Sequence, residues 1–179
     1  MTPSINAARI ARRMRLGLAG GGALVLTGLI LGAALPAAAE QAPATATAAG
    51  VIRVPSAYGF DETVTRLKGA IAAKGIRFFD EIDQSQLGAG AKIALRPSKL
   101  LLFGNPPLGV QFLTSNPIAG LDWPVRMLVV QDADGKVWVA WTDFRYIAGR
   151  YAIADRDAAF KMAAEVSGSI ASAVTGGKS

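Results

Sequence analysis

The side chains that most often carry out catalysis are missing from this chain, and three aspartates are the main candidates that remain. The sequence of 179 residues contains no cysteine and no histidine. Nucleophilic pairs of Ser or Cys with His are therefore excluded, as are zinc sites built on imidazole or thiolate. Asp83, Asp122 and Asp143 could instead converge as a general acid and base, or as ligands of a hard cation.

Each of these aspartates also has a simpler interpretation. Asp83 and Asp122 lie beside turn residues, where a carboxylate commonly accepts hydrogen bonds from backbone N–H groups. Asp143 follows a predicted strand and could pair with a nearby arginine. Because no regular spacing joins the three, we predict no catalytic residue, no metal ligand and no cofactor. A carboxylate-dependent hydrolase or isomerase is kept as the alternative.

The stretch Phe103-Gly104-Asn105-Pro106-Pro107 joins an apolar strand to a predicted helix. A helix N-terminus attracts anions through its free N–H groups, but two prolines in the first turn supply none. If Asn105 caps this helix, its side chain accepts the first available donor, the N–H of Leu108. The pattern therefore favours a structural corner over an anion site.

Three tryptophans could line a cleft for an apolar ligand. Trp138 and Trp141 lie three positions apart in one predicted strand, so their side chains should point to opposite faces of the sheet. One of them must then lie on the face away from the helices, which is the best candidate for a binding surface. We predict that a small, largely apolar ligand or a partner binds there and at its rim. The predicted binding residues are Phe103, Asn105, Asp122, Trp123 and Trp141.

The elements that must position these residues indicate an α+β domain. Strands are expected at 51–56, 76–82, 99–103, 125–130 and 137–142. Two long helices are expected at about 61–75 and 155–175, with Asp61 and Asp155 as their N-terminal caps. The turn Asp132-Ala133-Asp134-Gly135 predicts a hairpin between the last two strands. We expect a two-layer sandwich, with a mixed or antiparallel sheet of about five strands and two main helices packed on one face. Gly69 should be compensated by close packing against the sheet.

The second sheet face should also be covered. The hairpin strands are apolar at nearly every position between Val125 and Val130 and between Val137 and Trp141. A sheet face in contact with water normally alternates with polar residues. The pattern therefore predicts a small apolar ligand, a partner, or a second copy of the chain in a homodimer whose sheets meet.

The first fifty residues differ in composition from the rest. Four arginines precede an uncharged run from Leu16 to Leu35, and Ala37-Ala38-Ala39 suits signal peptidase. We predict a cleaved signal peptide at 1–39, a flexible lead-in at 40–50 and a single domain at 51–175, which makes the protein periplasmic or secreted in a bacterium. Arg12-Arg13 leaves twin-arginine export open beside ordinary secretion, and an uncut run could remain as a membrane anchor.

The basic character of the chain belongs mostly to this first segment. Residues 1–39 carry four of the 19 lysines and arginines and none of the 13 acidic residues, so cleavage lowers the net charge from +6 to +2. No basic stripe with interleaved aromatic residues is present either. We therefore expect no nucleic-acid partner, and membrane contact only through the signal segment.

Several short motifs together resemble the bacterial domain-of-unknown-function 302 family, over roughly Val54 to Val174. The motifs are Leu95-Arg96-Pro97, Phe103-Gly104-Asn105-Pro106, Gly120-Leu121-Asp122 with Trp123-Pro124, Asp134-Gly135-Lys136-Val137, and Tyr146-Ile147-Ala148 with Arg150. The resemblance implies a two-layer fold of the β-α-β type and no particular activity. The family often shows Asp-His where this chain has Asp83-Gln84, so any role of that imidazole in relatives does not extend to this member.

Overall fold

The computed structural model describes residues 45–46 and 50–176, all of which lie in one compact unit of the chain. The predicted signal peptide and most of the predicted lead-in lie outside the described residues. Within them, no helix combines the length and the apolar character needed to cross a membrane.

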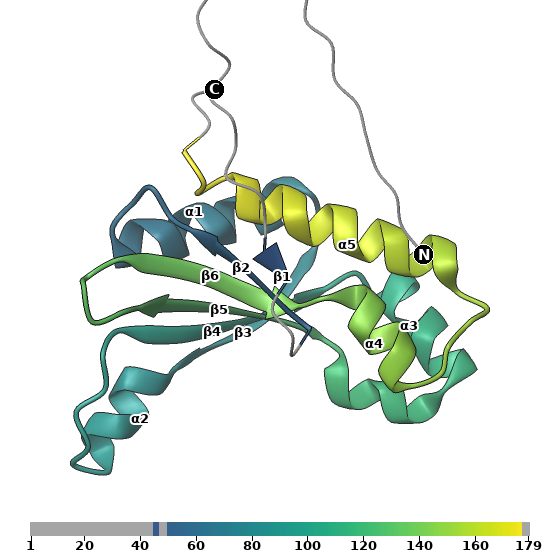
Figure 1. Cartoon of the computed structure of the whole chain (residues 1–179), viewed down its shortest axis with the longest axis horizontal. Coiled ribbons are helices and arrows are strands. Elements are labelled where there is room, and N and C mark those ends of the chain that lie inside the picture. The colour runs from purple at the N-terminus through teal and green to yellow at the C-terminus, as the bar shows by residue number, and fades with distance from the viewer. Residues whose placement is uncertain (1–44, 47–49, 177–179) are drawn as a thin grey trace, which may run out of the picture. The chain divides into compact units, whose positions relative to one another are not determined.

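The described strands form a single antiparallel sheet in the order β1-β2-β6-β5-β4-β3 (Figure 1). Five of them are the predicted strands, and a two-residue strand is added at one edge. Of the two sheet types left open by the sequence, the antiparallel one is therefore observed. The bounds are β1 Thr45–Ala46, β2 Val51–Pro55, β3 Arg77–Asp83, β4 Ser98–Gly104, β5 Val125–Gln131 and β6 Val137–Thr142.

The predicted hairpin joins β5 to β6. Gly135 adopts a φ of 79°, a left-handed conformation that glycine accepts without steric cost. The Asp132 carboxylate accepts hydrogen bonds from the backbone N–H groups of Asp134 at 3.0 Å and Lys136 at 2.9 Å. These bonds close the turn and set the register of the two strands.

Two long helices, α1 Phe60–Ala73 and α5 Asp157–Ser172, cover one face of the sheet, as predicted (Figure 1). Leu67 and Ile71 of α1 and Ile170 of α5 are fully buried. They share the core with side chains on that sheet face, where Leu101, Met127, Val129 and Val139 are also inaccessible to solvent. Burial of each such side chain contributes roughly 1.5–3 kcal/mol.

Two of the shorter helices begin at aspartates and were not predicted. α2 Gln84–Gly90 begins after Asp83, whose carboxylate accepts the Gln86 N–H at 2.9 Å. α4 Phe144–Arg150 begins after Asp143, whose carboxylate accepts the Arg145 N–H at 2.9 Å. The other short helices are α3 Pro106–Ser115 and the 3-10 helix η1 Pro117–Asp122.

Three local expectations about the long helices were wrong. Asp61 does not cap α1; the cap position is Gly59, and Asp61 lies in the first turn of the helix. Asp155 does not cap α5; its carboxylate accepts a hydrogen bond from the Ser115 hydroxyl at 2.6 Å and pairs with Arg156 at 2.6 Å. Apart from its chain neighbours and the α1 backbone, no atom of the described residues lies within 4 Å of the position that a Cβ at Gly69 would take, so close packing does not explain this glycine.

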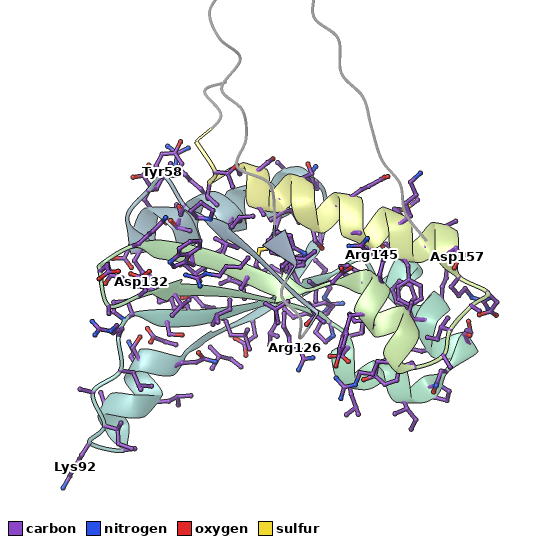
Figure 2. All side chains as sticks on the ribbon, in the orientation of Figure 1. Tyr58, Lys92, Arg126, Asp132, Arg145 and Asp157 are labelled. Atoms are coloured by element: carbon purple, nitrogen blue, oxygen red, sulfur yellow. The ribbon has the colours of Figure 1, made fainter. Side chains whose placement is uncertain are left out.

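The opposite sheet face is not covered by α1 or α5 (Figure 1). Its apolar side chains, Leu100, Leu102, Leu128 and Val130, are half-buried. The arm formed by α2 and the loop after it projects beyond this face, with Lys92 at its tip (Figure 2). Leu87, Ile93 and Leu95 of the arm are exposed.

Candidate functional site

A pocket of about 270 Å³ lies on the helix side of the sheet, where β4, α3 and α5 meet. This volume is close to the lower end of the range for small-molecule sites, about 300 Å³. The residues that line it are mainly apolar and come from elements far apart in the sequence. They are Lys74, Ile76, Phe103, Gly104, Asn105, Leu108, Gly109, Phe112, Trp123, Val125, Phe144, Met162, Ala163, Val166 and Ser167.

Trp123 forms one wall of this pocket, and Gly109 of α3 makes room for its indole. A Cβ at Gly109 would lie 1.8 Å from Nε1 of Trp123, a distance that no side chain can occupy. The Phe79 ring meets the same indole edge-on, with the ring centroids 5.8 Å apart and the planes at 74°. The position of the Trp123 indole therefore depends on the absence of a side chain at Gly109 and on the contact with the Phe79 ring of β3.

Three polar side chains among the lining residues have no partner within the described part of the chain. Lys74, directly after α1, is exposed and pairs with no carboxylate there. Ser167 of α5 is only 1% exposed, and its hydroxyl makes no hydrogen bond to any described residue. The third is the carboxamide of Asn105.

The free carboxamide of Asn105 corrects a prediction. The backbone carbonyl of Asn105, rather than its side chain, accepts the N–H of Leu108 at 3.0 Å and that of Gly109 at 2.8 Å. The carbonyl thus takes the Leu108 donor that a capping side chain would have used, while its bond to Gly109 is the first ordinary bond of the helix. The carboxamide stays available beside the pocket.

Of the predicted binding residues, the structure brings together Phe103, Asn105 and Trp123 at this pocket. It does so on the helix side of the sheet, whereas the sequence had suggested the rim of the open face. The difference arises because α3 turns back toward α5, and their contact encloses the end of β4.

Asp122 lies next to Trp123 in the chain, but its carboxylate faces other groups. It is 8% exposed and accepts hydrogen bonds from Arg126, from Arg150 at 3.1 Å and from the Tyr151 hydroxyl at 2.6 Å. The bond to Asp122 raises the pKa of Tyr151, because the carboxylate favours the protonated hydroxyl. This network joins the end of η1 to β5 and to the end of α4.

Trp141 and Trp138 point to opposite faces of the sheet, as their spacing predicts. Trp141 is 4% exposed and belongs to the core, where its Nε1 has no hydrogen-bond partner among the described residues. Trp138 lies on the open face, donates from Nε1 to Asp132 at 2.7 Å, and stacks under the Arg53 guanidinium at 3.4 Å. Neither indole lines the pocket.

The aspartates of the carboxylate alternative have separate partners. Asp83 caps α2, and Asp143 caps α4 and pairs with Arg145 at 2.9 Å. The hydrogen bond from Arg145 lowers the pKa of Asp143 below its ordinary value. Within residues 45–46 and 50–176, no group of three or more His, Cys, Asp or Glu side chains could hold a metal ion.

Most residues that line the pocket were not predicted, and Gly109, Ser167 and Lys74 illustrate why. Gly109 was visible as a glycine inside a predicted helix, a costly placement that often marks a close approach. Ser167 was visible as a hydroxyl on an otherwise apolar helix face. No feature of the sequence distinguishes Lys74, because exposed lysines are common near helix ends.

The family model described as "Domain of unknown function DUF302" matches residues 52–175. The chain belongs to this family. The DUF302 fold is seen again in a solved structure, the "uncharacterized conserved protein DUF302" from Bacillus stearothermophilus, with a TM-score of 0.60 and 18% identity. That comparison covers 72% of this chain and 98% of the other, and it confirms the fold that the motifs implied.

Curated proteins similar to this DUF302 chain include "Fluoride-specific ion channel FluC 1" from Brucella suis biovar 1 (strain 1330), 34% identical over 107 residues. "Fluoride-specific ion channel FluC 2" from Brucella melitensis biotype 1 is 34% identical over the same length. The match covers 58% of this chain and 41% and 38% of those proteins. The chain thus spans about two fifths of the length of these relatives.

Proposed function

We propose that this DUF302 domain is a non-catalytic binding module that takes a small, largely apolar molecule into the pocket between β4, α3 and α5. The observation that carries the proposal is an apolar pocket bordered by Lys74, Asn105 and Ser167, which have no partner among the described residues. Apolar walls with a few placed polar groups are typical of small-molecule sites. A ligand there would bury apolar surface, worth about 25 cal/mol per Å².

Naphthalene is a suitable first probe, because it is apolar and of similar size to the pocket. We expect it to raise the thermal midpoint and to shift the NMR signals of residues around Trp123. Fluoride, which the names of the Brucella relatives mention, should not displace it, because the pocket walls are apolar.

A matched pair of variants distinguishes this pocket from the open sheet face. Val166→Phe places a ring in the pocket, whereas Val130→Phe places the same ring on the opposite face. Binding should be lost in the first variant and kept in the second. Loss in Val130→Phe alone would move the site to the open face, and no binding by the wild type would reject the module.

The homodimer stays a prediction, which the half-buried open face and the exposed Leu87, Ile93 and Leu95 favour. Light scattering over a range of concentrations tests it. A stable dimer that is dispersed by Val130→Glu would support it, and a monomer at all concentrations would exclude it.

We also propose that the domain acts outside the cytoplasm, in the periplasm or secreted. The support is the arrangement of four arginines, an uncharged run and Ala37-Ala38-Ala39 in the first 39 residues. The intact mass of protein recovered from a bacterial envelope fraction should correspond to a chain that begins at Glu40. A mass that includes residues 1–39 would contradict cleavage.

A further inference from the structure

We infer that the ligand of this pocket is an amphipathic monocarboxylate, with its carboxylate at Lys74 and Asn105 and an apolar body that carries one oxygen inside the pocket. The inference rests on the binding module proposed above and adds the chemical class of its ligand.

The charge beside the pocket favours an anion. Lys74 is the one charged residue among those lining the pocket in the described part of the chain, and no carboxylate pairs with it there. Arg77, whose Cα is the partner of Gly104 in the sheet, likewise has no carboxylate partner among the described residues. Two cations without counter-ions attract a negatively charged group and disfavour a positively charged one.

Asn105 adds directional recognition to this charge. Its carboxamide can donate two hydrogen bonds, and its side chain has no partner within residues 50–176. Carboxylate oxygens are acceptors only, so they suit an ammonium and an amide N–H₂ group together. A neutral alcohol would use the amide but would gain little from the lysine.

The size and the apolar walls of the pocket indicate what the rest of the ligand is like. The pocket volume of about 270 Å³ lies just below the usual range of small-molecule sites, so it suits a small molecule. Phe103, Phe112 and Val166 supply apolar walls for a body of that size. A medium-length chain or a single ring fits this space, whereas a long-chain lipid does not.

Ser167 supplies the second, independent observation. Its side chain lines the pocket at 1% exposure, and its hydroxyl has no hydrogen-bond partner in the described part of the protein. Within the described residues, Trp141 Nε1 is the one fully buried side-chain polar atom without a partner, so the Ser167 hydroxyl keeps some contact with the pocket space. An oxygen on the ligand can hydrogen-bond to it there. The ligand body should therefore carry a hydroxyl or carbonyl group rather than being a plain hydrocarbon.

The charge is tested with octanoate, 1-octanol and octylamine, whose chains are matched, by isothermal titration or NMR at neutral pH. Octanoate should bind most tightly and octylamine least. Lys74→Gln should weaken octanoate about two- to fivefold, the range of an exposed ion pair, and leave 1-octanol unchanged. Lys92→Gln is the control, because it removes the same charge from an exposed residue at the tip of the arm, away from the pocket (Figure 2).

The outcomes separate this inference from the binding module. If 1-octanol binds as tightly as octanoate, or if both lysine variants weaken octanoate equally, the anion inference is rejected while the module remains. If none of the three compounds and no naphthalene binds, both are rejected. Thermal midpoints of the variants near that of the wild type show that any loss is not unfolding.

Ser167 is tested with hydroxyoctanoates that carry the hydroxyl at successive carbons. At least one isomer should bind more tightly than octanoate to the wild type and lose that advantage in Ser167→Ala. If Ser167→Ala weakens octanoate and all the isomers by the same factor, the hydroxyl does not contact the ligand and that part of the inference is wrong.

Discussion

Asp122 is the most densely bonded side chain near the pocket, and its bonds indicate a structural role. Two arginines and the Tyr151 hydroxyl converge on one buried carboxylate. Arg126 and Arg150 are both about half exposed, so water moderates the strength of their pairing. An amide at this position would keep only one acceptor oxygen for three donors and would turn an N–H₂ group toward one of them.

We therefore expect Asp122→Asn to lower the free energy of unfolding by about 1–3 kcal/mol, the usual effect when buried hydrogen-bonded groups lose a charged partner. Urea denaturation measures this difference. Asp134→Asn, at an exposed turn position, removes the same charge and should change stability by less than about 0.5 kcal/mol. Naphthalene binding by folded Asp122→Asn should be unchanged, and a loss there would mean that the carboxylate acts in the pocket.

At the scale of elements, the contact between α3 and Trp123 depends on one missing side chain. Gly109 lies in the interior of α3, where glycine is about 1 kcal/mol less favourable than alanine. The indole of Trp123 occupies the space that a Cβ would need. Glycine at this position lowers the helix propensity of α3, but it allows the Trp123 indole to approach the helix closely.

The same substitution at two glycines should have opposite effects. Gly109→Ala should lower the free energy of unfolding by roughly 1–3 kcal/mol, because the indole or the helix must move. Gly69→Ala, in the interior of α1 with no atom near its Cβ, should raise it by up to about 1 kcal/mol. Thermal and urea unfolding of both variants check this.

A Gly109→Ala variant as stable as Gly69→Ala would show that Trp123 can move without cost. The environment of Trp123 should then be altered in its NMR spectrum, while affinity for naphthalene reports whether the pocket survives. Unchanged stability with an unchanged spectrum would contradict the close contact itself.

At the scale of the whole molecule, carboxylates in ion pairs and caps make stability dependent on pH. Hydrogen bonds from Lys99 and then Lys68 lower the pKa of Glu81 below its ordinary value of 4.5. The pKa of Asp132 is lowered by the hydrogen bond from Trp138, and that of Asp143 by the bond from Arg145. Folding thus favours the ionised form of each group.

The sign of the effect follows from linkage. A carboxyl group with a lower pKa in the folded state stabilises the fold above its unfolded pKa, and this contribution is lost as the pH falls through the folded pKa. We expect the urea midpoint to fall between about pH 5 and about pH 3, with a smaller fall in Glu81→Gln. Glu165→Gln, an exposed residue without a partner among described residues, is the control. A wild-type midpoint constant over this range would contradict the prediction.

The sequence by itself determined the strands, the two long helices and the hairpin, because each depends on local periodicity and turn chemistry. It also determined that Trp138 and Trp141 face opposite ways, since alternation along a strand is a local property. It did not reveal α2 and α4, because their first turns depend on single aspartate caps within glycine-containing segments.

Only the tertiary structure decided where the candidate site lies. Phe103, Asn105 and Trp123 were recognisable from the sequence, but Lys74, Gly109 and Ser167 join them only because α1, α3 and α5 meet at the end of β4. The position and size of a pocket depend on how side chains from distant segments pack against one another. Because the hydrophobic effect is non-directional, a local stretch of sequence does not specify this packing. The local sequence pattern thus determined which faces of the helices and strands are apolar. The packing of the helices determined where a pocket remains between those faces.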